Sequence, residues 1–442
     1  MMRSSVKVIV LAILTLASSV SVSALPSANT PSAAIESKKH TLYNRQLSCS
    51  SQESISNLSL SNPVKAANKV LDIKHVMRDH GPLWDDENIV PGKGWFEQVP
   101  WARGAKYDFD PFARGDFENG FRSIPRSFSN FKLDHSVVLR RKGDKVAKAP
   151  VYINSHYDSK KIERVVIILP GQWRDSWSSI NTLGNALRVA EKYSELNVNE
   201  DNILLLSPVF LNQNDHKRGA LKSDEIYFQD SGWAAAGTTR GPDDFRGISS
   251  YSVIDHFVDF AFNTSNFPNM KRVVIAGHSM GAQAALRYAI LRKSQKHDKK
   301  ISYWVGNPGS FLYLDDKRPM SNHTSNCSDY NNFPMGFHGS HPKYVSQDFE
   351  NSDKIVSRFE NRRVHYSFGM DDNGGRSDKC SVNAQGPNRL ARGALWIKHL
   401  ARVYGGFPDT HSVDFASCIS HQDYPMFAHY EALKFLFTTQ ED

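Results

Sequence analysis

The chain has 442 residues, of which 40% are hydrophobic and 11% aromatic, and its formal net charge is +8. This composition is typical of a globular protein with a large core and argues against a disordered or fibrous chain. The positive charge is mild for this length. No nucleic-acid motif and no aromatic-interleaved basic patch accompanies the local basic clusters, so we expect no nucleic-acid partner.

Residues 1–24 are predicted to form a secretory signal. Arg3 and Lys7 precede an apolar run over residues 8–17, and small residues follow at 22–24. The run is too short to cross a bilayer, which favours a cleaved signal over a membrane anchor. No later segment is long and apolar enough to span a membrane, so we expect a secreted, soluble mature chain.

Cysteines and glycosylation sequons fit export. The four cysteines form an even set that an oxidising compartment would pair, and three connectivities are possible. Asn-x-Ser/Thr sequons would mark exposed loops in a secreted eukaryotic protein, and they occur at Asn57, Asn263, Asn322 and Asn326.

Three regions are expected after the signal. Residues 25–64 are rich in Ser, Ala, Asn and Pro and are predicted to be a flexible leader. Residues 65–130 are a loop-rich extension that we expect to cover the main domain. The tripeptide Arg114-Gly115-Asp116 within it is interpreted as a plain turn rather than an adhesion motif. Residues 131–442 are predicted to form the catalytic domain.

Strand-like and helix-like stretches alternate through this domain, a pattern that predicts an α/β fold with a mostly parallel, eight-stranded sheet and helices on both faces. The predicted strands are 135–141, 151–155, 164–169, 202–206, 272–276, 302–305, 365–368 and 416–419. The predicted helices are 179–193, 249–262, 283–293 and 389–404.

The sequence Gly277-His278-Ser279-Met280-Gly281 follows a β-branched run and precedes a helix-favouring stretch. This is the strand–turn–helix setting of a nucleophile elbow, in which a serine occupies a strained backbone conformation between two glycines. Ser279 is therefore the predicted nucleophile. His278 lies inside the elbow and is not expected to be its base.

Eight predicted strands with Ser279 just after the fifth resemble the α/β-hydrolase superfamily, and the resemblance covers roughly residues 131–437. It implies a catalytic acid and then a histidine, in that chain order. Asp372 stands in a Gly-x-x-Asp pattern after the seventh strand, although Asp371 and Asp372 could also simply build a turn. His421 follows the eighth strand and is the predicted base, with His411 as the alternative.

Two backbone N–H groups should stabilise the oxyanion formed during attack on an ester. One is that of Met280, and the other is that of Gln172 in the Pro-Gly-Gln-Trp sequence after the third strand. Trp173, Trp177 and Trp233 could bind an acyl or aryl group near this edge, or could equally be ordinary core residues.

The stretches 307–311 and 385–390 resemble secreted fungal or oomycete serine esterases and lipases. The resemblance implies hydrolysis of a carboxylic ester through an acyl-enzyme, with no metal and no organic cofactor. Because Cys380 follows the acid-bearing loop and Cys418 precedes His421, we expect these two cysteines to be bonded. That would leave Cys49 to pair with Cys327.

A second hypothesis concerns the leader. Arg45-Gln46-Leu47-Ser48 is similar to the Arg-x-Leu-Arg motif of oomycete effectors, although its fourth residue is Ser and no Glu-Glu-Arg run follows. This resemblance implies delivery into a host cell, where the fold would act on or bind a host component.

Overall fold

The structure is a computed structural model that describes residues 49–73, 105–345, 349 and 351–438. The predicted signal and the Arg45–Ser48 motif lie outside the described residues. The strands are β1 Arg114–Asp116, β2 Gly120–Ser123, β3 Ser127–Phe128, β4 Phe131–Asp134, β5 Val138–Lys142, β6 Lys145–Lys148, β7 Val151–Asn154, β8 Arg164–Leu169, β9 Ile203–Pro208, β10 Arg272–His278, β11 Ile301–Gly306, β12 Arg363–Gly369 and β13 His411–Ala416.

Helices alternate with these strands along the chain. They are α1 Cys49–Ser61, α2 Pro63–Leu71, α4 Ser176–Lys192, α5 Gln213–Arg218, α6 Ser250–Phe262, α7 Met280–Leu291, α8 Ser352–Glu360, α9 Cys380–Asn383, α10 Arg389–Tyr404, α11 Asp423–Ala428 and α12 Tyr430–Phe437. None of the helices in the described part of the chain combines the length and apolar character that a membrane span requires.

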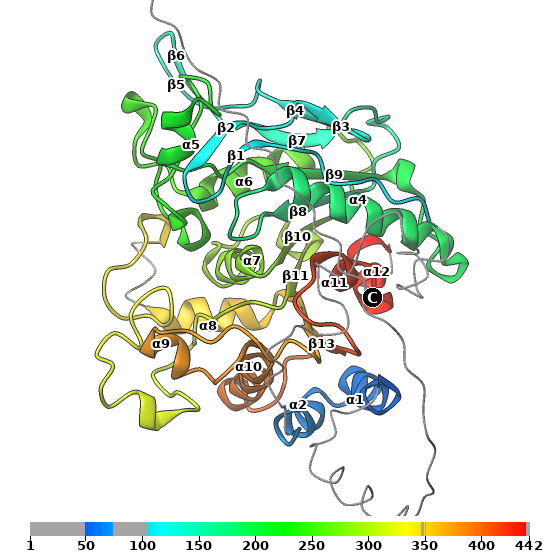
Figure 1. Ribbon diagram of the computed structural model, residues 1–442, viewed down its shortest axis with the longest axis vertical. Coiled ribbons are helices and arrows are strands. Elements are labelled where there is room, and N and C mark those ends of the chain that lie inside the picture. The colour runs from blue at the N-terminus through cyan, green and yellow to red at the C-terminus, as the bar shows by residue number, and fades with distance from the viewer. Residues whose placement is uncertain (1–48, 74–104, 346–348, 350, 439–442) are drawn as a thin grey trace, which may run out of the picture. The chain divides into compact units, whose positions relative to one another are not determined.

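The central sheet of the described residues has nine strands in the order β13-β12-β11-β10-β8-β9-β7-β4-β3. The six strands from β13 to β9 are parallel, and the last three pair antiparallel. Figure 1 shows α7 beside β10 and α4 beside β8 and β9. This is the α/β-hydrolase fold, with one more strand than the sequence predicts.

Strand periodicity explains why helices cover both faces. In β8, Val165 and Ile167 point into one hydrophobic core, whereas Val166 and Ile168 point into the other. The first core includes side chains of α6, α7, α8 and α10, and the second includes side chains of α4, α11 and α12. Successive strand side chains point to opposite faces, so a continuous apolar strand must be buried on both.

Two strand predictions are wrong in place. The predicted first strand, 135–141, contributes β5, which pairs with β6 in a separate two-stranded sheet because a turn at Gly143 reverses the chain. The predicted last strand, 416–419, is also displaced. The strand in this place is β13, which pairs with β12 and ends at Ala416. Cys418 has φ of +54°, which is incompatible with a strand.

The predicted flexible leader is helical from Cys49 onward. Asn62 caps α2 by accepting the N–H of Lys65 at 3.0 Å, and Pro63 occupies the first helical position. Ala66, Ala67 and Val70 are buried, and α2 packs against α10. The serine-rich composition conceals this short apolar face, which needs the main domain as its partner.

The expected disulfide between Cys380 and Cys418 is wrong, because Cys380 is bonded to Cys327 with their Cα atoms 5.8 Å apart. The loop after Asp372 carries Cys380 away from the sheet edge, so that α9 lies against the segment near Cys327. This bond also overturns the expected partner of Cys49. Cys418 is itself disulfide-bonded.

The four sequon asparagines are exposed in the structure. Asn57 lies within α1 rather than in the expected loop. Asn263 lies at the end of α6, Asn322 in a short 3-10 helix and Asn326 in a turn. All four are therefore accessible to a modifying enzyme in the folded chain, although glycosylation itself stays a prediction.

Candidate active site

Strand β10 and helix α7 meet in a sharp turn at Ser279. Its φ is +55° and its ψ is −117°, a strained conformation for a residue with a side chain. A Cβ atom on Gly277 would lie 2.2 Å from the backbone of Gly281, and one on Gly281 would lie 2.3 Å from the carbonyl oxygen of Leu169. Close packing of the turn against β8 therefore requires both glycines.

Hydrogen bonds connect the three residues predicted as a triad. His421 Nε2 lies 2.9 Å from Ser279 Oγ, and His421 Nδ1 lies 2.8 Å from Asp372 Oδ2. Asp372 is buried, with 1% of its surface exposed. An ionised carboxylate can only accept, so Nδ1 donates to Asp372, and Nε2 is left to accept the proton of the Ser279 hydroxyl.

Charges around the site favour this tautomer. Burial raises the pKa of Asp372, but His421 and Arg389 outweigh it and hold that pKa at about 2. Burial lowers the pKa of His421 below its usual range, although Asp372 opposes this change. His421 is therefore neutral at neutral pH, the state that a general base needs.

Arg389 is a residue of this site that sequence reasoning missed. It is the first residue of α10, and its Nε lies 2.9 and 3.0 Å from the two carboxylate oxygens of Asp372. The capping residue Asn388, which accepts the N–H of Ala391 at 2.8 Å, starts the helix at this point. The family-like stretch 385–390 was the available signal, but it did not say which side chain meets the acid.

The alternative base, His411, lies elsewhere. It is the first residue of β13, whereas His421 follows the end of the same strand, so the two lie at opposite edges of the parallel sheet. Its ring nitrogens face the Tyr366 hydroxyl at 3.3 Å and the Phe359 carbonyl oxygen at 3.2 Å. Burial lowers the pKa of His411 to about 4, which is typical of a structural histidine.

The N–H groups predicted for the oxyanion hole have no hydrogen-bond acceptor among the described residues. They belong to Met280, the first residue of α7, and to Gln172 in the loop after β8. The buried Arg174 fixes this loop: its guanidinium bonds both carboxylate oxygens of Asp215, at 2.9 and 3.2 Å, and the carbonyl oxygen of Phe117 at 2.9 Å. Preset, unpaired donors are what a developing oxyanion requires.

The three tryptophans have different environments. Trp177 and Trp233 are 4% and 1% exposed and pack in the core, so for these two residues the prediction of ordinary core residues is confirmed. Trp173, beside Gln172, is 49% exposed and stacks on Phe117, with ring centroids 5.7 Å apart. Phe117, itself 40% exposed, comes from the N-terminal extension, and no sequence pattern predicts its position here.

The loops at this edge are bonded to one another. Asn307, which follows β11, donates to the Ser420 carbonyl at 2.7 Å and accepts the Gly369 N–H at 2.8 Å. The Gln385 amide accepts the N–H of Phe311 and donates to its carbonyl, both at 2.9 Å. The two family-like stretches therefore bind each other, and Asn307 holds the segments that lead to Asp372 and His421.

Helix α1 also reaches the site. The buried Gln52 donates to Asp371 Oδ1 at 2.9 Å and accepts the Cys418 N–H at 2.6 Å. It therefore connects the residue before the acid to the loop that leads to His421. His278, within the elbow, has its ring centroid 4.7 Å from that of His421 and its Nδ1 3.3 Å from Asp423.

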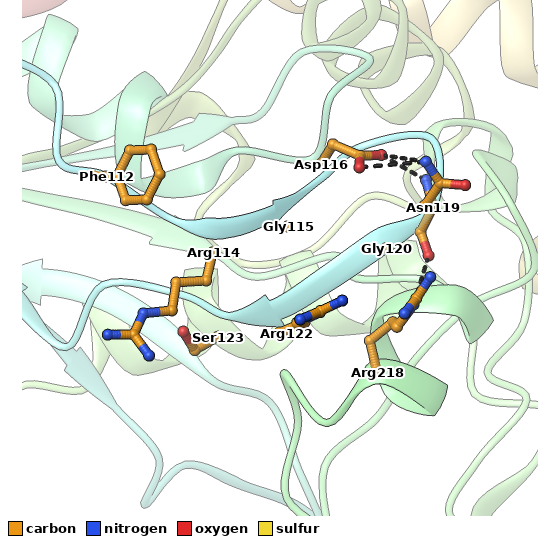
Figure 2. Close-up of a pocket in the computed structure, with 9 residues that line it drawn as sticks. All are labelled: Phe112, Arg114, Gly115, Asp116, Asn119, Gly120, Arg122, Ser123 and Arg218. Atoms are coloured by element: carbon orange, nitrogen blue, oxygen red, sulfur yellow. Dashed lines mark hydrogen bonds between the residues drawn. The ribbon is translucent and has the colours of Figure 1, made fainter. Parts of the chain in front are cut away.

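The Arg114-Gly115-Asp116 tripeptide forms β1 of a hairpin. Figure 2 shows the Asp116 carboxylate turned toward Asn119, whose backbone N–H it accepts at 2.6 Å and whose amide nitrogen lies 3.2 Å away. The tripeptide is thus a strand rather than the predicted plain turn, and the Asp116 carboxylate is engaged within the turn that follows it. The hairpin borders a hollow of about 530 Å³ that also includes Phe112, Arg122 and Arg218.

Comparisons with known proteins show similarity of structure. No family model matches the sequence, and no curated protein matches it either. Among solved structures, poly(aspartic acid) hydrolase-1 from Sphingomonas sp. KT-1 is 16% identical over 69% of this chain and 97% of its own, with a TM-score of 0.45. The poly(3-hydroxybutyrate) depolymerase LpqC from Bordetella parapertussis is 16% identical over 67% and 85%, with a TM-score of 0.41.

The siderophore hydrolase EstB from Aspergillus nidulans is 12% identical over 71% of this chain and 95% of its own, with a TM-score of 0.36. At such identities the likeness concerns the fold alone. The order of the strands and the elbow after β10 place this chain in the α/β-hydrolase fold.

Proposed function

We propose that this protein is a serine hydrolase that cleaves carboxylic esters, with Ser279 as nucleophile, His421 as general base and acid, and Asp372 as the orienting acid. The observation that carries the proposal is the unbroken chain of hydrogen bonds from the Ser279 hydroxyl through His421 to Asp372. It begins on a strained elbow, and the N–H groups of Met280 and Gln172 have no hydrogen-bond acceptor among the described residues. These features together suit acyl transfer.

The geometry suggests the following steps. Ser279 Oγ attacks the carbonyl carbon while His421 Nε2 takes the hydroxyl proton, and the N–H groups of Met280 and Gln172 bind the oxyanion. The intermediate collapses as the alkoxide leaves with the proton from His421. Water then attacks the acyl-enzyme, giving its proton to His421, and the Ser279 oxygen recovers that proton as the carboxylic acid departs.

Esters are favoured over amides because an alkoxide needs less leaving-group assistance than an amine. The exposed pair of Trp173 and Phe117 beside the Gln172 loop supports a substrate with an apolar or aromatic group. Peptides and thioesters are the nearest chemical alternatives.

Export into an oxidising compartment is part of the proposal. The disulfide between Cys327 and Cys380 and the exposed sequon asparagines are consistent with it. Delivery into a host cell remains the alternative location, and binding of a host component is then the alternative function.

The test is labelling of the full-length secreted protein with a serine-reactive fluorophosphonate. We expect the wild type to be labelled, the Ser279→Ala variant not to be labelled, and His421→Gln to be labelled at least about 100-fold more slowly. The matched control is His411→Gln, which should keep its labelling. Labelling that survives Ser279→Ala would refute the nucleophile, and a folded wild type that is never labelled would favour the binding function.

A further inference from the structure

A cavity of about 620 Å³ lies where hairpin β5–β6 meets the start of α6 and the end of α7. Four segments that are distant in sequence contribute cationic side chains to its lining, namely Arg140, Arg141, Lys142, Arg246, Lys293 and Lys343. Among the described residues, Asp244 contributes the one carboxylate that lines the cavity with them. In the sequence the Arg140–Lys142 cluster resembles an ordinary solvated face, and only the fold adds the other cations to it.

Part of this positive charge is neutralised within the protein and part is not. Asp244 pairs with Lys142 at 3.3 Å and also with Lys145, and Arg246 pairs with Asp243 at 2.6 Å. By contrast, no carboxylate among the described residues forms an ion pair with Arg140, Arg141 or Lys343.

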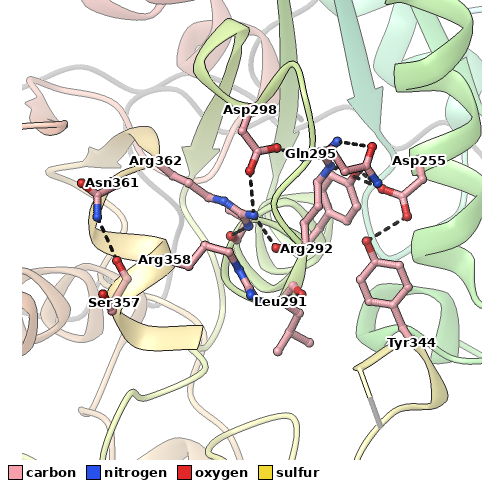
Figure 3. A network of polar contacts seen from close by, with 12 residues as sticks. Asp255, Leu291, Arg292, Gln295, Asp298, Tyr344, Ser357, Arg358, Asn361 and Arg362 are labelled. Carbon is pink, nitrogen blue, oxygen red and sulfur yellow. Dashed lines mark hydrogen bonds and ion pairs between the residues drawn. The ribbon is translucent and has the colours of Figure 1, made fainter. Parts of the chain in front are cut away.

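The wall that carries Lys343 is fixed to the body of the domain. The neighbouring Tyr344 donates its hydroxyl to Asp255 Oδ2 at 2.8 Å, and Tyr288 donates to Oδ1 of the same carboxylate at 2.7 Å. Figure 3 shows Tyr344 and Asp255 in this arrangement, with the buried Arg292 3.4 Å from that carboxylate. Lys343 Nζ also lies 3.3 Å from where a Cβ atom of Gly247 would be.

The cavity is separate from the proposed catalytic site. Ser279 precedes α7 and Lys293 follows it, so the length of a twelve-residue helix, about 18 Å, lies between them. The N–H groups of Ser250 and Tyr251 at the start of α6 already bond to Gly237 and Ser249. The cationic side chains, rather than this helix end, are therefore what the cavity offers to a ligand.

We propose that this cavity, lined by Arg140, Arg141 and Lys343 among its cations, is a binding site for a soluble polyanion that carries at least two phosphate or sulfate groups. Guanidinium groups match the oxygens of such groups in pairs of hydrogen bonds, and an ammonium adds a point charge. Cations on several walls can be neutralised together only by a ligand with several charges. Nucleic acid fits less well, because the aromatic side chains that line the cavity among the described residues are already packed: Phe245 is buried, and the Tyr344 ring lies against Tyr251 and Tyr288.

Isothermal titration calorimetry of the full chain with tripolyphosphate and with sucrose octasulfate tests the site, with orthophosphate as the singly grouped control. At low salt we expect one tripolyphosphate per chain, weaker binding as salt rises, and much weaker binding of orthophosphate. The triple variant Arg140→Ser, Arg141→Ser, Lys343→Ser should lose at least tenfold in affinity while keeping the wild-type thermal unfolding midpoint.

The matched control removes the same charge from exposed positions outside the cavity, with Arg126→Ser, Lys192→Ser and Lys398→Ser. It should bind nearly as the wild type does. Equal losses in both triple variants would show that only net charge matters and would overturn the site. The proposal would also be overturned if the wild type bound neither polyanion, or if it bound only duplex DNA or only anionic lipid vesicles.

Discussion

Arg389 should influence the pH below which the proposed reaction loses activity. Its Nε bonds both oxygens of Asp372, and Asp372 in turn bonds His421, so the three groups lie in a row. The positive charge of Arg389 disfavours a second positive charge on the imidazole, and it lowers the pKa of His421. Replacing Arg389 with Met, which keeps much of the side-chain length but removes the charge, should therefore raise the pKa of His421.

The magnitude follows from the geometry. Two successive hydrogen bonds place the charges about 6 Å apart, and at an effective dielectric constant of about 20 their repulsion is about 3 kcal/mol, or roughly two pH units. Arg389 and His421 are 21% and 27% exposed at their side chains, so solvent screening reduces this effect. We expect the acid limb of the pH profile to move upward by about one pH unit.

The assay is the pH dependence of kcat/KM for a soluble ester, whose acid limb reports ionisation of the free enzyme. Only neutral His421 can accept the Ser279 proton, so activity falls as the pH drops below the pKa of His421, and a higher pKa moves that fall toward neutral pH. Arg389→Lys keeps the charge and should keep most of the wild-type profile. An acid limb that stays in place or moves downward in folded Arg389→Met would refute this reasoning.

The same variant has a stability signature with a definite sign. The pKa of Asp372 is about 2 in the folded chain, below its ordinary value of 3.8, so ionisation of Asp372 stabilises the fold above about pH 4. This stabilisation is lost as the pH falls toward 2. The cost of Arg389→Met in the free energy of unfolding should therefore be complete at pH 7 and should shrink between about pH 4 and 2.

Three further predictions concern the surroundings of the site. Trp173→Ala should raise KM for an aryl ester about five- to tenfold with little change in kcat, and a similar loss for an acetyl ester would argue against an aromatic contact. Gly281→Ala should abolish activity and lower the thermal unfolding midpoint, since its Cβ would meet a carbonyl oxygen at 2.3 Å, whereas Gly406→Ala, with nothing within 4 Å, should do neither. Asp215→Asn should cost about 3–5 kcal/mol in urea unfolding because it leaves the buried Arg174 unpaired, and a cost below 1 kcal/mol would contradict that account.

Short-range patterns in the sequence predict the parts of the fold that depend on neighbouring residues. The β-branched run before Ser279, with glycines at 277 and 281, specifies a strand, a tight turn and a helix, and the structure has all three. Helix α10 has the predicted bounds because Asn388 caps its start and Gly405, with φ of +75°, ends it. These features are local because backbone sterics and capping bonds act within a few residues.

Tertiary structure decided everything that depends on the path of a long loop. Cys380 meets Cys327 rather than Cys418 because the loop after the acid leads away from the sheet edge, and no local pattern encodes that path. Arg389 reaches Asp372 across 17 residues, and Phe117 reaches Trp173 from another region of the chain. The predicted strands, together with the order nucleophile, acid, histidine along the chain in the superfamily, are enough to nominate the catalytic residues. The positions of the partners that support these residues are set by packing between distant segments, which composition and periodicity do not record.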